Sequence, residues 1–267
     1  MIDLHSHILP AIDDGAPSVD TALEMARIAV ADGITHLACT PHIVPGLYDN
    51  DAAGIEAATA SLADALDHAG IGLVLFAGAD IHVTPELRSR LDAGTSPTIA
   101  GTRYFLFEPP HHVLPPGIAQ LARDVMDAGY VPVLTHPERL TWIENSYDTI
   151  CQLDESGVAI QLTAGSVTGG FGSRAQYWSE RMLAEGRVDI VASDAHDARR
   201  RPPVLSKARD RIAELLDDDA AWRMTRDNPA TILNDLPLPA KRRVRATPQD
   251  RRGWSWFGKG ARSPRRR

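Results

Sequence analysis

Histidines and carboxylates recur along this chain in short motifs whose spacing suits metal binding. The segment IDLHSHIL places His5 and His7 two residues apart, and VASDAH repeats that spacing with Asp194 and His196. Alternate side chains of an extended segment share one face, so each pair can point toward a common centre. Imidazole and carboxylate together are usual ligands of Zn, Mn or Fe, whereas Ca prefers oxygen alone. One pair also suits a surface or packing role, so the prediction of a metal site depends on donors elsewhere.

Such donors follow several other apolar runs. His42 lies in CTPH, Asp80 in GADIH, Glu108 in FLFEPP and His136 in VLTHPER. Each comes directly after a stretch typical of a buried strand. The C-terminal ends of parallel strands lie together, and functional residues of α/β proteins gather there. Because acids concentrated at that place would repel one another without cations, we predict a metal centre.

Short apolar runs and helical patterns alternate along the chain. The apolar runs predict seven strands, over residues 1–5, 35–40, 73–78, 103–107, 131–135, 158–162 and 188–192. The clearest helical pattern covers residues 18–33, where Ser18 can cap the start and Gly33 can end the helix. Further helical regions are predicted over residues 51–70, 115–129, 173–186 and 206–224. This alternation indicates one α/β domain with parallel strands, either an open doubly wound sheet or a closed barrel.

Charge divides the chain into an acidic body and a basic tail. Residues 241–267 carry eleven Lys or Arg and one acid, which leaves 17 basic and 34 acidic residues in the rest. An acidic body disfavours nonspecific binding of nucleic acid, so we expect no nucleic-acid partner. We predict a domain over residues 1–238 and a disordered tail over residues 239–267. The tail residues Trp254, Trp256 and Phe257 lie among arginines.

That composition suits an anionic membrane surface or an acidic partner, and the alternatives are folding back on the body or no role. The sequence contains no signal-peptide pattern and no apolar run of about 18 residues. Two cysteines, Cys39 and Cys151, provide no disulfide framework. We therefore expect a cytoplasmic protein, with membrane association through the tail left open.

The motifs DLHSHILPAIDDG, TPHI, GADI, HPER and ASDAH occur in an order that resembles the PHP (polymerase and histidinol phosphatase) superfamily. Within it they are most similar to the capsule-type CpsB/YwqE bacterial tyrosine phosphatases. The resemblance implies a distorted seven-stranded (β/α)7 barrel similar to a TIM barrel, which agrees with the seven predicted strands. It also implies a hydrolase that dephosphorylates a bacterial tyrosine kinase controlling capsular or exopolysaccharide synthesis. The implied cofactors are three divalent metal ions, with Mn favoured over Fe or Zn.

The resemblance distributes the ligands over three ions. The first would take His5, His7, Asp80 and Asp194, the second Asp80, Glu108 and His136, and the third Asp14, His42 and His196. Asp14 is favoured over Asp13, which would cap or orient, although Asp-Asp-Gly is also ordinary turn chemistry. Relatives usually have Glu where Asp80 stands, and an Asp carboxylate reaches roughly 1.5 Å less far.

Catalytic roles are predicted for Arg139, Asp80, His42 and His196. Divalent ions would activate water, and Arg139 would hold phosphoryl oxygens, with a structural salt bridge as its alternative role. Two other functions stay open. One is a small-molecule phosphoesterase of the histidinol-phosphatase kind, and the other is a weakly active module that binds phosphorylated partners.

Three further features have less certain roles. Cys39 and Cys151 lack the following Arg of a cysteine phosphatase, so we predict that both are core residues. His111 and His112 follow Glu108 and either line the substrate entrance or belong to a solvated loop. The segment TGGFGS at 168–173 is predicted to be a mobile loop near the site.

Overall fold

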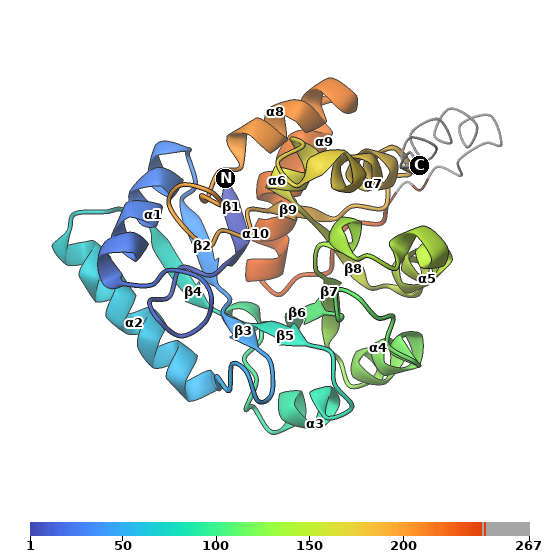
Figure 1. Cartoon of the computed structure of the whole chain (residues 1–267), viewed down its shortest axis with the longest axis horizontal. Coiled ribbons are helices and arrows are strands. Elements are labelled where there is room, and N and C mark those ends of the chain that lie inside the picture. The colour runs from blue at the N-terminus through green and yellow to red at the C-terminus, as the bar shows by residue number, and fades with distance from the viewer. Residues whose placement is uncertain (242, 244–267) are drawn as a thin grey trace, which may run out of the picture.

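Parallel strands occupy the middle of the molecule and helices surround them (Figure 1). The computed structural model describes residues 1–241 and residue 243. The strands are β1 (Ile2–Ser6), β2 (His36–Cys39), β3 (His42–Ile43), β4 (Val74–Ala77), β5 (Asp80–His82), β6 (Tyr104–Glu108), β7 (Val131–Leu134), β8 (Ala159–Thr163) and β9 (Ile190–Ala192). They form two sheets, ordered β1-β2-β4 and β3-β5-β6-β7-β8-β9, and the pairings within both are parallel. The result is an α/β domain whose parallel sheet forms a half-barrel.

All seven predicted strands have counterparts, but the described residues contain nine strands because two short ones were not predicted. Thr40 and Pro41 separate β2 from β3, and Gly78 and Ala79 separate β4 from β5. Pro41 has no backbone N–H, so it cannot donate to a neighbouring strand. The two breaks lie side by side, since a Cβ added to Gly78 would lie 3.2 Å from Thr40 Cγ2. The chain therefore leaves one sheet at these breaks and enters the other.

Strand β1 meets the chain just beyond β9, which brings the first and last histidine motifs together. Ser6 forms a parallel bridge with Ala195. The His7 backbone N donates to Ala195 O at 2.8 Å, and Asp194 N donates to His5 O at 2.9 Å. Backbone hydrogen bonds thus fix His5 and His7 beside Asp194 and Ala195, which lie almost 190 positions later in the sequence.

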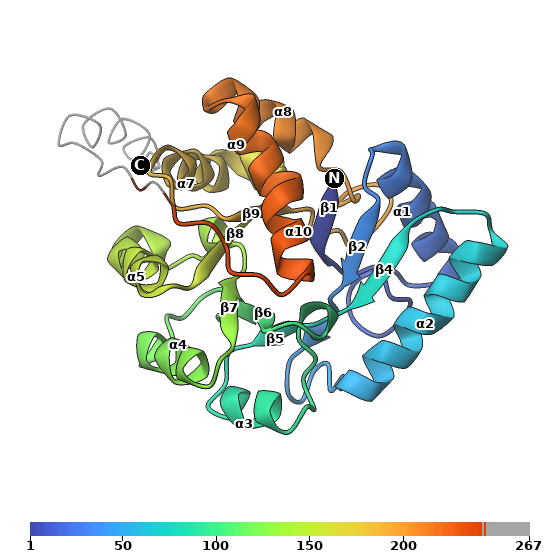
Figure 2. The same cartoon turned by 180° about the vertical axis from the view of Figure 1, so that it is seen from behind.

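The helices cover the outer face of the strands, except α10 (Asn228–Leu233), which packs against the inner face (Figure 2). The others are α1 (Val19–Ala31), α2 (Ala52–His68), α3 (Leu87–Asp92), α4 (Ile118–Asp127), α5 (Ile143–Ser156), α6 (Ala164–Val167), α7 (Gly172–Ala184), α8 (Ser206–Leu215) and α9 (Asp218–Trp222). Short 3-10 turns cover Ile99–Gly101 and Pro137–Arg139, and a π-helical turn covers Arg223–Asp227.

Local signals placed the clearest helices correctly. Ser18 Oγ accepts a hydrogen bond from Thr21 N at the start of α1, and Gly33 follows its end with φ 85°. The region predicted over residues 206–224 instead contains two helices. Leu216 leaves helical geometry with ψ −88°, and the Asp217 carboxylate then caps α9. Helices α3 and α6 were not predicted, because four to six residues show too little periodicity.

Strand β6 is buried on both faces, as in parallel sheets covered by helices. Phe105 and Phe107 belong to the apolar cluster shared with the surrounding helices. Tyr104 and Leu106 belong to a second cluster on the inner face, which also contains Ile232 of α10. Both faces of the sheet are therefore packed, so the strand ends that carry the chemistry rest on a rigid base.

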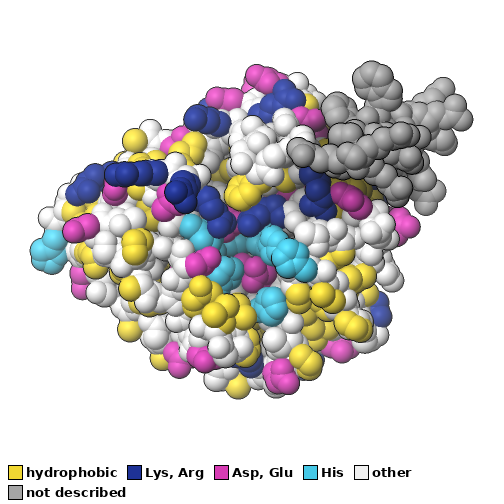
Figure 3. Space-filling view, in the orientation of Figure 1, with side chains coloured by type: hydrophobic (Ala, Val, Ile, Leu, Met, Phe, Trp, Pro, Cys, Tyr) yellow, Lys and Arg dark blue, Asp and Glu magenta, His cyan; other side chains and the backbone are white. Residues whose placement is uncertain are grey.

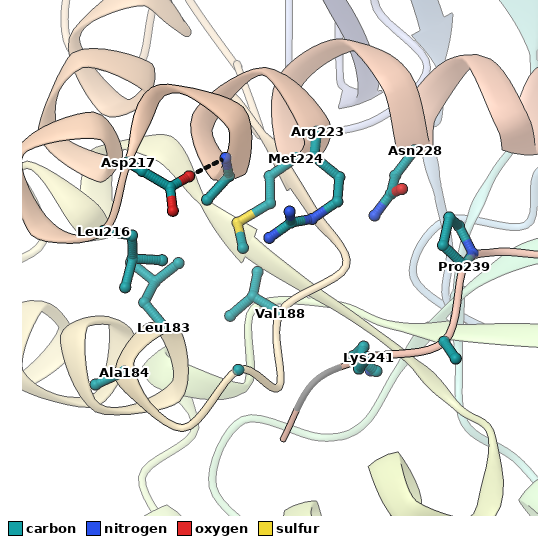
Figure 4. A pocket seen from close by; sticks show the side chains of 13 residues that line it. Leu183, Ala184, Val188, Leu216, Asp217, Arg223, Met224, Asn228, Pro239 and Lys241 are labelled. Carbon is teal, nitrogen blue, oxygen red and sulfur yellow. Dashed lines mark hydrogen bonds between the residues drawn. The ribbon is translucent and has the colours of Figure 1, made fainter. Parts of the chain in front are cut away.

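The chain after α10 crosses the N-terminal ends of the strands and ends its described part against α5 and the residue that precedes β9. Lys241 Nζ lies 2.5 Å from carboxylate oxygens of both Asp154 and Asp189, and Arg243 Nε lies 2.7 Å from Asp154 Oδ2. Figure 2 shows this segment from behind, between α10 and α7. Figure 4 shows Lys241 beside a cavity of about 630 Å³ that Leu183 and Met224 also line.

The start of the predicted tail therefore lies on the acidic body. Residues 239–241 and Arg243 belong to the described structure, and the remaining tail prediction, including Trp254, Trp256 and Phe257, concerns residues outside it. Among the described residues, none of the helices combines the length and apolar character needed to cross a membrane.

We predict that Gly15→Ala destabilises the protein by about 1–3 kcal/mol, because the added methyl group overpacks the turn below His7. A Cβ on Gly15 would lie 2.0 Å from His7 O and 2.5 Å from His7 Cβ. Gly72→Ala is the matched control, since a Cβ there meets no atom within 4 Å. Urea unfolding of both variants measures the effect, and equal midpoints would contradict it.

Candidate metal centre

The predicted donors gather in a hollow at the C-terminal end of the strands, where Figure 3 shows clustered His and acidic side chains. His42 begins β3, Asp80 begins β5, and the two residues are register partners. The sequence analysis placed both residues directly after the preceding strands, which are β2 and β4. His5 and Asp80 are fully buried and form the floor with His7. Above the floor is a cavity of about 200 Å³, lined by Asp14, His42, Glu108, His111, His136, Arg139, Asp194, His196 and Arg201.

The imidazoles of His5 and His7 face each other through their Nε2 atoms, which are 3.1 Å apart. Their other ring nitrogens contact oxygen acceptors. His5 Nδ1 lies 2.9 Å from Gln161 Oε1, and His7 Nδ1 lies 2.7 Å from Asp13 Oδ2. Donation from both Nδ1 atoms leaves both Nε2 lone pairs available, which is the usual arrangement of histidines around a metal ion.

The two neighbouring aspartates have different surroundings. Asp13 Oδ2 contacts His7 Nδ1 and accepts a hydrogen bond from His42 N at 3.0 Å, while its Oδ1 accepts one from Gly15 N. Asp14 Oδ1 lies 3.6 Å from His42 Nε2 and 3.5 Å from His196 Nε2. Asp14 is therefore placed to share a cation with two imidazoles, and Asp13 is placed to orient His7.

Asp80 lies at the middle of the donors. Its Oδ2 is 3.4 Å from His5 Nε2, 3.5 Å from His42 Nδ1 and 3.9 Å from His136 Nε2. Both carboxylate oxygens are buried without a hydrogen-bond partner in the described structure. A buried charge without partners is costly, so this environment fits a bound cation. The shorter Asp side chain thus still reaches three imidazoles.

Five groups of donor atoms each lie within 4.8 Å of one another and could hold a metal ion. The groups are His7, Asp14, His42 and His196; His5, His7 and Asp80; His5, His136 and Asp194; Glu108, His111 and His136; and His42, Asp80 and Glu108. All nine predicted ligands occur in these groups. Several donors belong to two groups, so the groups form one continuous cluster of possible metal ligands.

His111 is a donor that sequence reasoning left undecided. It belongs to the cavity wall, and its ring centroid is 5.2 Å from that of His136. His112, in contrast, is exposed and contacts Thr141. The only sequence signal for His111 was its position three residues after Glu108.

Asp194 joins the imidazoles to two arginines. Its Oδ1 lies 3.4 Å from Nε2 of both His5 and His7. Its Oδ2 accepts hydrogen bonds from Arg139 Nη1 and from Arg201 Nη2, the latter at 2.6 Å. Arg139 thus forms the salt bridge considered as an alternative, and it also lines the cavity. Arg201 was missed, although it ends a run of three arginines shortly after ASDAH.

Backbone strain accompanies two of the donors. His136 has φ 37° and Asp194 has φ 53°, in the left-handed region that non-glycine residues rarely adopt. Such strain is common at functional sites. The prediction of an extended segment from Asp194 to His196 is wrong at Asp194, whose φ of 53° is left-handed. A local turn, rather than strand pleating, brings both side chains to the centre.

Phe171 supports the arginine pair. The guanidinium carbon of Arg139 lies 4.5 Å from the Phe171 ring centroid, and that of Arg201 lies 5.5 Å away. These are cation–π distances. Gly165 makes room for the ring, since a Cβ there would lie 2.8 Å from Phe171 Cε2. The glycine-rich segment therefore connects α6 to α7 and places an aromatic ring beside the cavity.

The buried carboxylates attract positive charge. Burial disfavours the charged form of His5, yet Asp80 and Asp194 raise its pKa to about 9. Burial likewise opposes charge on His42, but Glu108 and Asp80 raise its pKa to about 10. In contrast, burial and the nearby His136 lower the pKa of His111 to about 4. The field at the centre of the site thus favours cations.

Neither cysteine has the properties of a nucleophile. Burial raises the pKa of the Cys39 thiol to about 12 and that of the Cys151 thiol to about 11. Cys39 is fully buried in β2, and Cys151 is partly buried against the core from α5. Because a thiolate is the reactive form, these positions confirm the prediction of core residues.

Several known proteins are similar to this chain in sequence, in fold or in both. Tyrosine-protein phosphatase YwqE of Bacillus subtilis is 34% identical over 248 residues, covering 91% of this chain and 98% of YwqE. Tyrosine-protein phosphatase CpsB of Streptococcus pneumoniae is 28% identical, covering 88% of this chain and 99% of CpsB. An organophosphorus hydrolase with 14% identity and a TM-score of 0.54, covering 87% of this chain and 92% of that protein, shares the fold alone.

The structure is also similar to one from a study of YwqE from Bacillus subtilis and CpsB from Streptococcus pneumoniae, described as metal-dependent tyrosine phosphatases. The TM-score is 0.88 with 32% identity, covering 92% of this chain and 100% of that structure. The family description for capsular polysaccharide synthesis, CpsB/CapC, matches residues 1–234. This match spans nearly all of the described residues, and the chain therefore belongs to the CpsB/CapC family.

Proposed function

We propose that this chain is a metal-dependent protein-tyrosine phosphatase that acts on a bacterial tyrosine kinase of capsular or exopolysaccharide synthesis. Relatives in the same family are named tyrosine-protein phosphatases. The observation that carries the proposal is the Asp194 carboxylate, which contacts the imidazole cluster through one oxygen and two arginines through the other. Cation ligands and phosphate-binding groups therefore share one small cavity.

The ligand assignment belongs to the proposal. We assign three cations to the sets His5, His7, Asp80 and Asp194; Asp80, Glu108 and His136; and Asp14, His42 and His196. One observed donor group contains the whole third set, and the others overlap the first two sets without coinciding with them. His111 lies beside Glu108 and His136 as a further donor. Mixed nitrogen and oxygen donors suit Mn, with Fe or Zn as alternatives. Bound divalent cations supply Lewis-acid activation of water and neutralise phosphoryl charge.

The chain's own residues bind and orient the phosphoryl group. Arg139 and Arg201 offer planar N–H donors to its oxygens, and Asp194 and Phe171 hold both guanidinium groups in place. Asp80, His42 and His196 complete the proposed catalytic set, with His42 and His196 in the cavity wall and Asp80 buried below it. The leaving phenolate has a conjugate acid with a pKa of about 10, so departure needs little acid assistance.

The surface around the cavity favours a polypeptide substrate over a small phosphomonoester. Leu47 and Val113 are 68% and 63% exposed, and they lie in loops that follow β3 and β6 at the same end of the strands as the site. Leu47 and Val113 would offer apolar contacts to a polypeptide that extends beyond the cavity. We place the chain in the cytoplasm, where its basic tail would bring it to an anionic membrane surface or to an acidic partner.

We predict that a chelator abolishes hydrolysis of a phosphotyrosine peptide and that added Mn²⁺ restores it, because the site needs cations to activate water. Elemental analysis of the active protein should give three metal ions per chain. Histidinol phosphate is the comparison substrate. Full activity in chelator, or faster hydrolysis of histidinol phosphate than of the peptide, would contradict the proposal.

We predict that Arg201→Ala lowers kcat/KM for the peptide about tenfold to hundredfold, since a charge-assisted hydrogen bond contributes about 1.5–3 kcal/mol. Metal content should stay unchanged. Arg199→Ala is the control, because Arg199 is exposed in the same loop but does not line this cavity. It also does not line a neighbouring cavity of about 250 Å³ beside Phe171. Equal kcat/KM for the two variants would remove Arg201 from phosphate binding.

We predict that Gln161→Leu weakens metal binding about tenfold to hundredfold, because the variant no longer accepts a hydrogen bond from His5 Nδ1. The fully buried Gln161 lies on β8, below the cavity. Titration of the apoprotein with Mn²⁺ measures the change, with unfolding midpoints as the control for folding. Unchanged affinity in a folded variant would show that Gln161 does not orient His5.

A further inference from the structure

A second cavity, of about 250 Å³, lies beside the metal centre and has no role in the function proposed above. It is bounded by the α6–α7 connection, the loop after β9 and the start of α8. We propose that it is a subsite for a second anionic group of the substrate, a carboxylate or a second phosphate close to the phosphotyrosine. This inference rests on the proposed function and specifies which peptides the same site prefers.

Cations line this second cavity without acids. Arg200, Arg201 and Lys207 belong to its wall, and none of its lining residues is Asp or Glu. Arg200 and Lys207 are exposed, and neither has an ion-pair partner among residues 1–241 and 243. Arg201 is already paired with Asp194, so Arg200 and Lys207 supply the positive charge of this wall that an external anion can meet.

Asp197 binds the backbone of the arginine loop and leaves the Arg200 side chain without an ion pair in the described structure. Asp197 Oδ1 accepts hydrogen bonds from the backbone N of Arg199 at 2.6 Å and of Arg200 at 2.5 Å. The Arg201 backbone N also approaches it, at 3.4 Å. The arginine run therefore has a defined backbone while the Arg200 side chain stays available to a ligand.

Arg201 connects the two cavities because it lines both. Its Nη2 donates to Asp194 Oδ2, whereas its Nε is buried without a hydrogen-bond partner in the described structure. The Nε atom is enclosed by protein, so Arg201 would meet a ligand through the exposed part of its guanidinium, which forms part of both cavity walls. One substrate can thus place its phosphotyrosine in the first cavity and a second anion in the other.

The remaining wall suits a side chain with an apolar stem. Phe171, Val204 and Ala208 contribute apolar surface, and Thr168 contributes a hydroxyl group. The N-terminus of α8 adds little, because the Ser206 and Leu205 N–H groups already donate to Asp32 Oδ2. The attraction for anions therefore comes mainly from Arg200 and Lys207, since Arg201 also pairs with Asp194. A Glu or phosphoserine side chain matches a cavity with these walls.

Matched phosphotyrosine peptides test the subsite in the full-length, Mn²⁺-loaded protein. One series carries Glu at positions flanking the phosphotyrosine, a second carries Gln, and a third carries phosphoserine. We expect kcat/KM of the wild type to be about threefold to tenfold higher for the anionic peptides than for Gln peptides, as for solvent-accessible ion pairs. The third series shows which anion is preferred.

Lys207→Ala and Arg200→Ala should each reduce this preference, and the double variant should remove it. Arg199→Ala, the matched control in the same loop, should keep it. Turnover of p-nitrophenyl phosphate, which has no second anion, should stay unchanged in all four variants. Equal kcat/KM of the wild type for all peptides, or full preference in the double variant, would overturn the proposal.

Failure of the proposed function would look different, since the wild type would then hydrolyse none of the phosphotyrosine peptides, whether or not it turned over p-nitrophenyl phosphate. The anisotropy of labelled peptides would still decide the subsite in that case. Tighter binding of Glu or phosphoserine peptides that is lost in the double variant supports it. Equal binding of charged and neutral peptides overturns it.

Discussion

Negative charge buried at the C-terminal end of the strands is the constraint on which the rest of the site depends. Asp80, Glu108 and Asp194 have little or no contact with water, and they face imidazoles rather than backbone donors. Such a group is stable only with positive charge among its members. The neighbouring carboxylates therefore raise the pKa values of His5 and His42. Bound divalent cations would balance the same negative charge while the imidazoles stay neutral.

The buried negative charge and its imidazole partners come from segments that lie far apart in the sequence. Backbone hydrogen bonds between β1 and the segment after β9 hold His5 and His7 against Asp194. Asp13 and Gln161 then contact the outer nitrogens of the two histidines and determine which ring atoms face inward. The positions of the donors therefore follow from sheet topology first and from local contacts second, and a capsule-family phosphatase needs both levels.

Much of this arrangement could be predicted from the sequence, because a regular element repeats its pattern over many residues. The apolar runs located the strands, and Ser18 and Gly33 delimited α1. The interruptions at Thr40–Pro41 and Gly78–Ala79 were missed, because nothing in a short run shows which sheet each half will join. His111 and Arg201 lie in loops, where the backbone path decides what a side chain reaches. Asp194 converges on the site through a left-handed turn that no periodicity reveals.

The ion pairs of Lys241 and Arg243 place the described end of the chain opposite the cavity. These residues are bound to Asp154 and Asp189 near the N-terminal ends of β8 and β9, whereas the cavity opens at the other end of the same strands. The chain thus departs from the base of the half-barrel. The described end of the chain therefore leaves the mouth of the cavity uncovered and open to substrates approaching from solution.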